Sequence, residues 1–292
     1  MTNAKTKGRK HDGAAQKTIE EVESFYKDHH EIKESHGIGH VMRVYNHAKE
    51  AVQVHNTNNS VPNQPDGRGA VPMTDEQSMM VLIAALLHDV DDHKYFPNNN
   101  NYENARTIMD KVFDTYNNGD SSHDTKETII QLISFVSCSK NKNSIPELVK
   151  KKEKNHHQLQ GSEDDAYWML IPRWADRLEA VGRQGVVRCY QYNREHGEKL
   201  SSEKSPRPQT EEEVWFFAKP QRFENYDGNS TDMISHYYDK LLHVSCPPPD
   251  IVRNPYLERM AKESSKELVE VCVRYGRTGV VDEEYIQSLQ QQ

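Results

Sequence analysis

The stretch MMVLIAALLHDV (79–90) decides how this chain folds. Its apolar run, Met79 to Leu87, leaves no polar face for water, so the segment predicts a buried, central helix. The run is about half of the ~20 apolar residues that a membrane span requires. It delivers His88 and Asp89 at its end, where burial of an unpaired carboxylate would be costly. A bound metal ion would offset that cost.

A second helix is predicted upstream, over about residues 35–55. Its apolar positions recur every three or four residues, at Ile38, Val41, Tyr45, Ala48 and Val52. A separate face carries polar residues that step by four, three and four positions and therefore stack on one another: His36, His40, Arg43 and His47. Further along, Asp176 is an acidic residue within an otherwise apolar helical segment, WADRLEA (174–180). Imidazole and carboxylate groups in this combination suit a divalent metal ion.

The rest of the chain also favours helices, so we expect an all-α fold. Helices are predicted near 18–26, 102–116, 124–138, 165–193, 230–244 and 256–275, and Pro172 is expected to kink or restart the fourth of them. Long loops are expected at 56–74, 139–164 and 194–228, with a short strand or hairpin near 214–224. We expect a loose tail over 1–16, a single domain over 17–280 and a polar tail over 281–292.

Composition excludes several classes of protein. The 292 residues carry a formal net charge of −8, which argues against a protein that grips a nucleic-acid backbone. The basic run at 150–154 is interpreted as a solvated loop. The four cysteines lie far apart without metal-ligand spacing, which is typical of reduced thiols. With a polar N-terminus and no membrane span, the chain is expected to be cytoplasmic; its oligomeric state stays open.

The order of these residues resembles the HD-domain superfamily of metal-dependent phosphohydrolases. In that pattern the first ligand precedes Val-x-Arg-Val, as His40 does here, and the pair His88-Asp89 and then Asp176 follow. The segments DRLEAVG (176–182) and SHYYDKLL (235–242) resemble the small single-domain bacterial branch. The resemblance implies an all-α helical bundle with long loop insertions. It also implies that His40, His88, Asp89 and Asp176 hold one divalent ion: Mn, Ni, Co, Fe, Zn or Mg, with Mn favoured.

One departure from the family bears on the number of ions. Two-metal members carry additional histidines between the His-Asp pair and the final aspartate, whereas the corresponding segment here reads ISFVSCS (133–139). Hydroxyl groups replace imidazoles poorly as ligands, so we expect one metal. His93 and His123 remain alternative ligands.

The resemblance also suggests roles around the metal. Asp92, three residues after Asp89, matches an acidic residue that acts as general base or acid in some members; alternatively, Asp91 and Asp92 only cap a turn. The candidate cations for a phosphate group are Arg43, Lys94, Arg177 and Lys240, and the candidate substrate-contacting histidines are His36 and His236. Arg177, with acidic neighbours in sequence, has a structural ion pair as its alternative.

The expected activity is divalent-metal-dependent hydrolysis of a phosphate ester or anhydride. The expected partner is a small phosphate-bearing molecule, above all a nucleotide, which would make the protein a nucleoside triphosphate pyrophosphohydrolase or a nucleotidase. The Gly-Tyr-Pro signature of cyclic-dinucleotide enzymes is absent. The alternatives are a phosphodiesterase, a catalytically silent nucleotide-binding HD module, and a di-iron oxygenase, which needs more histidine ligands.

Overall fold

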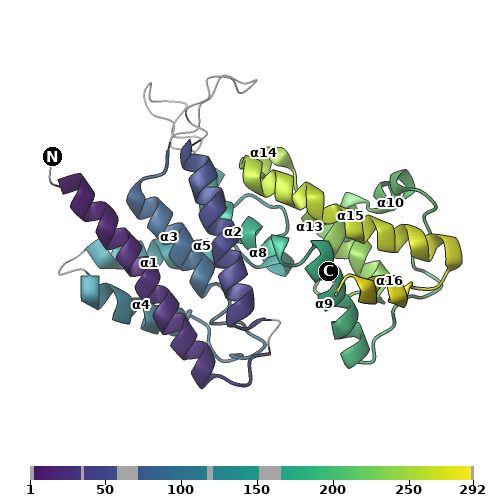
Figure 1. Ribbon diagram of the computed structural model, residues 1–292, viewed down its shortest axis with the longest axis horizontal. Coiled ribbons are helices and arrows are strands. Elements are labelled where there is room, and N and C mark those ends of the chain that lie inside the picture. The colour runs from purple at the N-terminus through teal and green to yellow at the C-terminus, as the bar shows by residue number, and fades with distance from the viewer. Residues whose placement is uncertain (1–2, 34–35, 58–71, 117–120, 151–165, 291–292) are drawn as a thin grey trace. The chain divides into compact units, whose positions relative to one another are not determined.

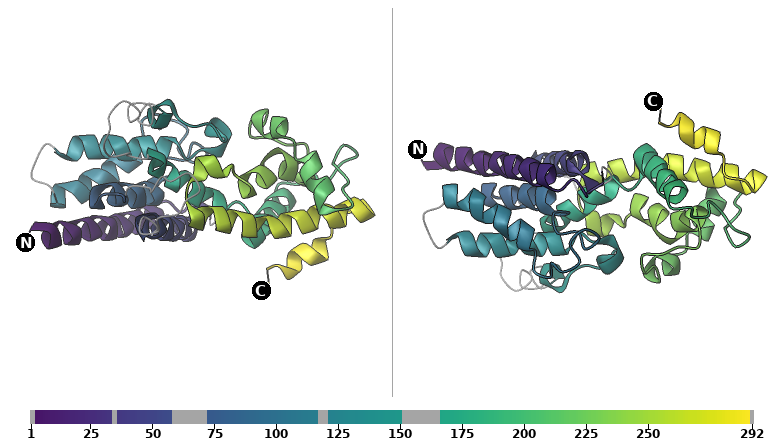
Figure 2. Two further views of the ribbon diagram at one scale, coloured as in Figure 1. Left: turned by 90° about the horizontal axis from the view of Figure 1, so that it is seen from above. Right: turned by 90° about the horizontal axis from the view of Figure 1, so that it is seen from below.

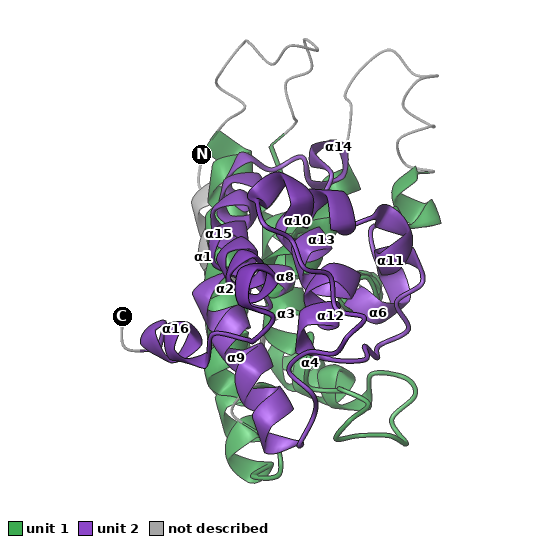
Figure 3. Cartoon of the chain, turned by 90° about the vertical axis from the view of Figure 1, so that its right-hand side faces the viewer, with its two compact units in different colours: residues 1–137, 145–176 green, residues 138–144, 177–292 purple. Residues whose placement is uncertain are grey.

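A computed structural model of the chain describes residues 3–33, 36–57, 72–116, 121–150 and 166–290, and within these ranges it contains helices and no strand (Figures 1 and 2). The expectation of an all-α fold is confirmed. The chain divides into two compact units, coloured separately in Figure 3. Unit 1 comprises residues 1–137 and 145–176, and unit 2 comprises residues 138–144 and 177–292. The division falls inside the range for which one domain is expected.

Unit 1 is organised around α3 (Asp75–Leu87). This helix contacts α1 (Asn3–Asp28), α2 (Ile38–Thr57) and α5 (Ser121–Ser134), while α4 (Glu103–Tyr116) packs on α1 and α5. Nearly every residue from Met79 to Leu87 is buried, so the predicted central helix is confirmed. A capping box fixes its start, because the Thr74 hydroxyl accepts from the Gln77 backbone at 3.1 Å and the Gln77 side chain accepts from the Thr74 backbone at 2.8 Å.

Both ends of the chain are more ordered than the sequence predicts. Helix α1 begins at Asn3, inside the segment expected to be a loose tail. Ala14 and Ala15 are buried in this helix. The sequence did not predict this, because residues 2–16 have no large apolar side chains. The expected polar tail at the other end includes α16 (Glu283–Ser288), which buries Ile286 and is followed by the buried Leu289.

Unit 2 is organised around the long helix α15 (Pro255–Thr278). It contacts α9 (Gly182–Glu195), α10 (Glu211–Phe217), α13 (Leu242–Ser245) and α14 (Pro249–Val252). The predicted helix near 230–244 is present as α12 (Met233–His236), a π-helical turn η4 (Tyr237–Leu241) and α13. Helix α11 (Pro220–Glu224) packs on η4, and α16 packs on α9.

The strand or hairpin expected near 214–224 is wrong, since this segment contains α10 and α11. The aromatic residues suggested a strand, but local signals favour helices. Thr210 caps α10 by accepting from the Glu213 backbone, and acidic residues fill the first turn of that helix. Pro220 occupies the first turn of α11, where its missing N–H costs nothing.

The helix expected over 165–193 is divided into three parts: η3 (Ala166–Leu170), α8 (Ile171–Leu178) and α9. The restart at Pro172 is confirmed, because α8 begins one residue before it. A second break, which the sequence did not predict, lies at Gly182, whose φ of +66° favours glycine. The expected loops at 56–74 and 139–164, and the basic run at 150–154, lie largely outside the described residues.

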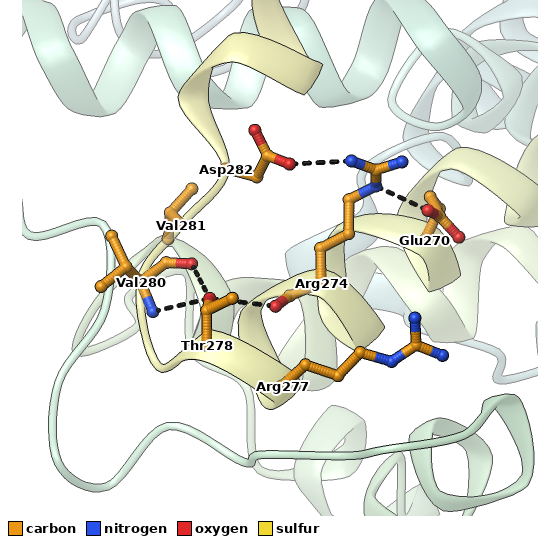
Figure 4. A pocket seen from close by; sticks show the side chains of 7 residues that line it. All are labelled: Glu270, Arg274, Arg277, Thr278, Val280, Val281 and Asp282. Carbon is orange, nitrogen blue, oxygen red and sulfur yellow. Dashed lines mark hydrogen bonds and ion pairs between the residues drawn. The ribbon is translucent and has the colours of Figure 1, made fainter.

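A pocket of about 450 Å³ lies where α15 ends and α16 begins (Figure 4). Arg274 donates to Glu270 at 2.6 Å and to Asp282 at 2.8 Å, and its guanidinium lies 4.3 Å from the centre of the Tyr285 ring. These contacts join the two helices, so the charge of Arg274 is used within the fold.

Two further predictions can be compared with the described residues. All four cysteines, each within the described ranges, are free thiols. Among the described helices, none combines the length and the apolar character needed to cross a membrane.

Candidate metal centre

Four side chains of unit 1 bring their ligand atoms together. His40 lies in the first turn of α2, His88 and Asp89 follow the end of α3, and Asp176 lies in α8. The Nε2 atoms of His40 and His88 are 3.2 Å apart. Asp89 Oδ2 lies 3.5 Å from His40 Nε2 and 3.4 Å from His88 Nε2. Asp176 Oδ1 lies 3.4 Å and 3.6 Å from the same two nitrogens. The structure therefore brings together all four residues that the sequence suggests as ligands.

These separations suit a first-row divalent ion. Two ligand atoms each about 2.1 Å from an ion lie about 3.0 Å apart at an octahedral angle and about 3.4 Å apart at a tetrahedral angle. The distance between the two histidine nitrogens and the distances from these nitrogens to the two carboxylates, 3.2–3.6 Å, match that geometry. The ligand atoms of His40, His88 and Asp89 all lie within 4.8 Å of one another, and Asp176 approaches this group through the two histidines. Two imidazoles and two carboxylates form a mixed donor set of the kind that Mn, Fe, Co, Ni and Zn accept.

The local fold holds His88 in one tautomer. Its Nδ1 lies 2.9 Å from the carbonyl oxygen of Ala85, one helical turn earlier. Because a carbonyl oxygen only accepts hydrogen bonds, Nδ1 carries the proton and donates it. Nε2 therefore faces His40 and the two carboxylates, and once it is unprotonated its lone pair is directed there, which is the orientation a metal-binding histidine needs.

Burial and charge compete within the cluster. Burial acts to raise the pKa of Asp89 and of Asp176, but the two imidazoles outweigh it and lower both values. Burial acts to lower the pKa of His88, and the two carboxylates outweigh it and raise that value. A cation entering the cluster therefore competes with protons, so metal affinity falls as the pH is lowered.

The cluster keeps one side open. The side chains of His40 and His88 are 4% and 1% exposed, whereas those of Asp89 and Asp176 are 20% and 25% exposed. Water or a substrate can therefore approach from the side of the carboxylates.

Three more predicted site residues form a group beside the cluster. The ring centre of His36 lies 6.4 Å from that of His40. His36 Nε2 lies 3.4 Å from Lys94 Nζ and 3.9 Å from Asp92 Oδ2. The backbone N–H of Lys94 donates to Asp92 Oδ1 at 3.0 Å, which fixes the direction of that carboxylate. A base, an imidazole and a cation thus adjoin the donor cluster within unit 1.

The neighbouring aspartates Asp91 and Asp92 have different surroundings. Asp91 accepts from the backbone N–H groups of Asn104 and Ala105 at 3.0 and 2.9 Å, and from the side chain of Asn99 at 2.5 Å. Burial raises its pKa despite those amides. Asp91 therefore caps the start of α4 and ties the turn after α3 to that helix. The alternative of a capping role fits Asp91, and Asp92 also caps its turn by accepting from the Lys94 backbone, while its second oxygen lies 3.9 Å from His36 Nε2.

The other unit 1 candidates do not join the cluster. Arg43 is exposed on α2. Its guanidinium lies 3.6 Å from the position that a Cβ atom would occupy on Gly39. His93 and His123, the alternative ligands, are both exposed.

In unit 2, Arg177 is buried and used within the fold. It donates to the Asn143 side chain at 2.9 Å and also to the Lys142 carbonyl oxygen, so it holds the segment 138–144. Its contact with a substrate stays a prediction.

His236 and Lys240 flank one face of unit 2. The His236 ring lies 5.5 Å from that of Tyr226, over which Lys240 Nζ lies at 6.0 Å, and Ser230 Oγ is 3.4 Å from His236 Nδ1. Burial, assisted by the charge of Lys240, lowers the pKa of His236 to about 3. His236 is therefore neutral near pH 7, and any contact it makes with a phosphate group is that of an uncharged imidazole.

This half-buried histidine predicts a pH dependence of stability. Below pH 6.5, His236 becomes protonated in the unfolded chain but stays neutral in the folded chain. The free energy of unfolding therefore falls as the pH is lowered towards 3. Each pH unit in that window contributes at most about 1.4 kcal/mol. Between pH 7 and pH 5, the wild type should therefore lose about 2 kcal/mol more than the variant His236→Gln in urea unfolding.

The exposed His196 of the same unit supplies the control. His196→Gln should lose stability with pH as the wild type does. Equal slopes for the wild type and His236→Gln would contradict the burial of a neutral imidazole at this position.

Residues that the sequence did not suggest also surround the site. Tyr26 of α1 is buried, and burial together with the charges of Asp89 and Asp92 raises its pKa. Tyr95 lies beside His36, with 6.0 Å between the ring centres. The sequence places Tyr26 only within the helix predicted near 18–26, and Tyr95 lies in a turn whose conformation the sequence does not define.

Comparison with known proteins gives one clear relative. No family model matches the chain. It is 34% identical over 247 residues to "Uncharacterized protein L803" of Acanthamoeba polyphaga mimivirus, a match that covers 82% of this chain and 88% of the viral protein. Crystal structures of the Lin1889 protein of Listeria innocua and of a protein of Lactobacillus plantarum match with TM-scores of 0.46 and identities of 17% and 16%, covering 94% of this chain and 95% of each.

Proposed function

We propose that this chain, which belongs to the same family as the mimivirus protein L803, is a divalent-metal-dependent phosphohydrolase of the HD type that acts on a nucleotide. The observation that carries the proposal is the convergence of His40, His88, Asp89 and Asp176, in which each histidine Nε2 lies 3.2–3.6 Å from the other nitrogen and from an oxygen of each carboxylate. Their order along the chain, as well as their chemistry, is that of the superfamily.

These four residues would hold one divalent ion, with Mn favoured. Such an ion supplies a Lewis acid that polarises a phosphoryl oxygen and makes a water molecule more acidic. Four protein ligands leave room for water and a substrate oxygen in an octahedral arrangement. The segment 133–139, with serines where two-metal members have histidines, supports a single ion.

The adjoining group would carry the proton transfer and bind the phosphate. Asp92 accepts the proton of the attacking water, since its carboxylate is oriented by the Lys94 backbone and faces His36. The Lys94 ammonium, 3.4 Å from His36 Nε2, stabilises negative charge that develops on the phosphoryl oxygens. The Nε2 atom of His36 lies 3.4 Å from Lys94 Nζ and 3.9 Å from Asp92 Oδ2, and His36 orients both of these side chains.

A substrate screen tests the proposal. The purified protein is reloaded with Mn(II), Ni(II), Co(II) or Mg(II) and offered nucleoside tri-, di- and monophosphates and a nucleotide phosphodiester, with separate detection of phosphate, pyrophosphate and the products of diester cleavage. We expect hydrolysis that depends on the added ion and is fastest with Mn(II). Pyrophosphate release would identify a pyrophosphohydrolase, and phosphate release a nucleotidase.

Two outcomes would overturn the proposal. Binding of metal and nucleotide without turnover would support a silent nucleotide-binding module instead. Cleavage confined to diesters would make the protein a phosphodiesterase. The variant His123→Ala, which changes an exposed histidine outside the donor cluster, should behave as the wild type throughout.

A further inference from the structure

The turn that follows the donor cluster carries two aromatic residues in fixed positions. The backbone N–H groups of Tyr95 and Phe96 both donate to the carbonyl oxygen of Asp92, each at 2.9 Å. The two rings are therefore positioned by the same residue whose carboxylate faces His36. Both side chains are half-buried, so each keeps surface exposed to solvent.

Phe96 is used in packing. Its ring centre lies 5.9 Å from that of Phe25 and 5.2 Å from that of His29, and the Phe25 and His29 rings are themselves 4.3 Å apart. These contacts hold the turn against the end of α1. They give the turn a rigid support that does not involve Tyr95.

Tyr95 lies on the side of the turn that faces the site. Its ring centre is 6.0 Å from that of His36, which is 6.4 Å from that of His40. Its hydroxyl accepts from the backbone N–H of Lys33 at 3.3 Å. The ring is therefore held at both ends, by the turn and by this hydrogen bond, and stands next to the group formed by His36, Asp92 and Lys94.

We propose that Tyr95 is the stacking residue for the base of the nucleotide. The inference rests on the proposed function and adds to it a residue that binds the base. With the phosphate between the donor cluster and Lys94, the base would extend past His36 to Tyr95, whose ring centre lies 6.0 Å from that of His36. An aromatic ring accepts every base, because each base has a π face. A ring that is already fixed loses little freedom on binding, which favours affinity.

A matched pair of ligands separates base binding from phosphate binding. Adenosine 5′-(α,β-methylene)diphosphate and methylenediphosphonate share the same hydrolysis-resistant P–C–P group, and only the first carries a base. Their dissociation constants are measured by calorimetry on the Mn(II)-loaded full chain. For Tyr95→Ala we expect roughly 10-fold weaker binding of the adenosine ligand and less than about 2-fold change for methylenediphosphonate.

Further variants distinguish stacking from support of the fold. Tyr95→Phe keeps the ring but loses the hydroxyl that accepts from Lys33, so it should bind the adenosine ligand much more tightly than Tyr95→Ala does. Tyr95→Leu keeps apolar bulk without the ring, so it should resemble Tyr95→Ala even where alanine destabilises the turn. The control is Tyr45→Ala, since Tyr45 is half-buried on α2 but about 140° around that helix from His40. It should change neither dissociation constant.

Three results would overturn the inference, and they differ in what they say about the proposed function. Equal weakening of both ligands by Tyr95→Ala and Tyr95→Leu would make Tyr95 a structural residue. A wild type that binds methylenediphosphonate as tightly as the adenosine ligand would have no base subsite, while its phosphate site would stand. A wild type that binds neither ligand would remove the proposed function together with this inference.

Discussion

Replacing Asp89 by asparagine should abolish metal binding while the chain remains folded. Asparagine keeps the shape of the side chain but removes the charge that lies 3.4–3.5 Å from both histidine nitrogens. A metal ion supplies several kcal/mol of transition-state stabilisation, so kcat/KM should fall by about 1000-fold or more. Metal content, measured by elemental analysis after gel filtration, should fall from one Mn per chain to near zero.

The same experiment on two other residues makes the result interpretable. His88→Gln should have the same effect as Asp89→Asn, because it removes the nitrogen that the Ala85 carbonyl orients. His123→Ala should keep full metal content and activity, since His123 is exposed. A folded Asp89→Asn protein with wild-type metal content and activity would show that the donor cluster is not the catalytic centre.

Replacing Asp92 by asparagine should separate metal binding from catalysis. Asp92 Oδ2 lies 3.9 Å from His36 Nε2, in the group beside the donor cluster, so the variant should keep its metal. Loss of a general base typically lowers the rate by about 10²–10⁴-fold. We therefore expect kcat to fall within that range, with little change in KM or in metal content, when turnover is measured at saturating Mn(II).

Asp91→Asn is the matched control, because it changes the neighbouring aspartate. Asp91 accepts from the backbone of Asn104 with one oxygen and of Ala105 with the other, and asparagine keeps only one acceptor oxygen, so the lost hydrogen bond should lower stability by about 1 kcal/mol. At a temperature where both variants are folded, Asp91→Asn should keep kcat within a few-fold of the wild type. An Asp92→Asn variant with the kcat of the wild type would exclude Asp92 as the base, and one without metal would make it a ligand.

The central part of the fold could be predicted from sequence because its signal is local. The apolar run 79–87 has no polar face, so it had to be buried, and α3 is. His40, His88, Asp89 and Asp176 could be named together because their order along the chain carries information that no single residue does. Their convergence then requires only that α2, α3 and α8 belong to the same unit.

Other features depend on contacts that leave no periodic pattern. The burial of Ala14 and Ala15 is invisible among small and polar residues. The aromatic residues of α10 suggested a strand because aromatic content was weighed above the cap at Thr210. Arg177 looked like a phosphate ligand because its partners, Lys142 and Asn143, are far from it in sequence. Tyr95 lies in a turn, where side-chain direction follows from backbone hydrogen bonds and not from spacing.

The hydrogen bonds by which Asp91 ties the turn after α3 to the start of α4 have a consequence for how this protein can change over generations. Two of its hydrogen bonds go to main-chain N–H groups at positions 104 and 105, and every residue except proline offers such a donor. Substitutions at these positions therefore keep both bonds, while Asp91 itself has few substitutes. Among descendants of this chain, an aspartate at 91 would persist without co-variation at positions 104 or 105, and of the three donors only Asn99, whose side chain also donates to Asp91, could co-vary with it.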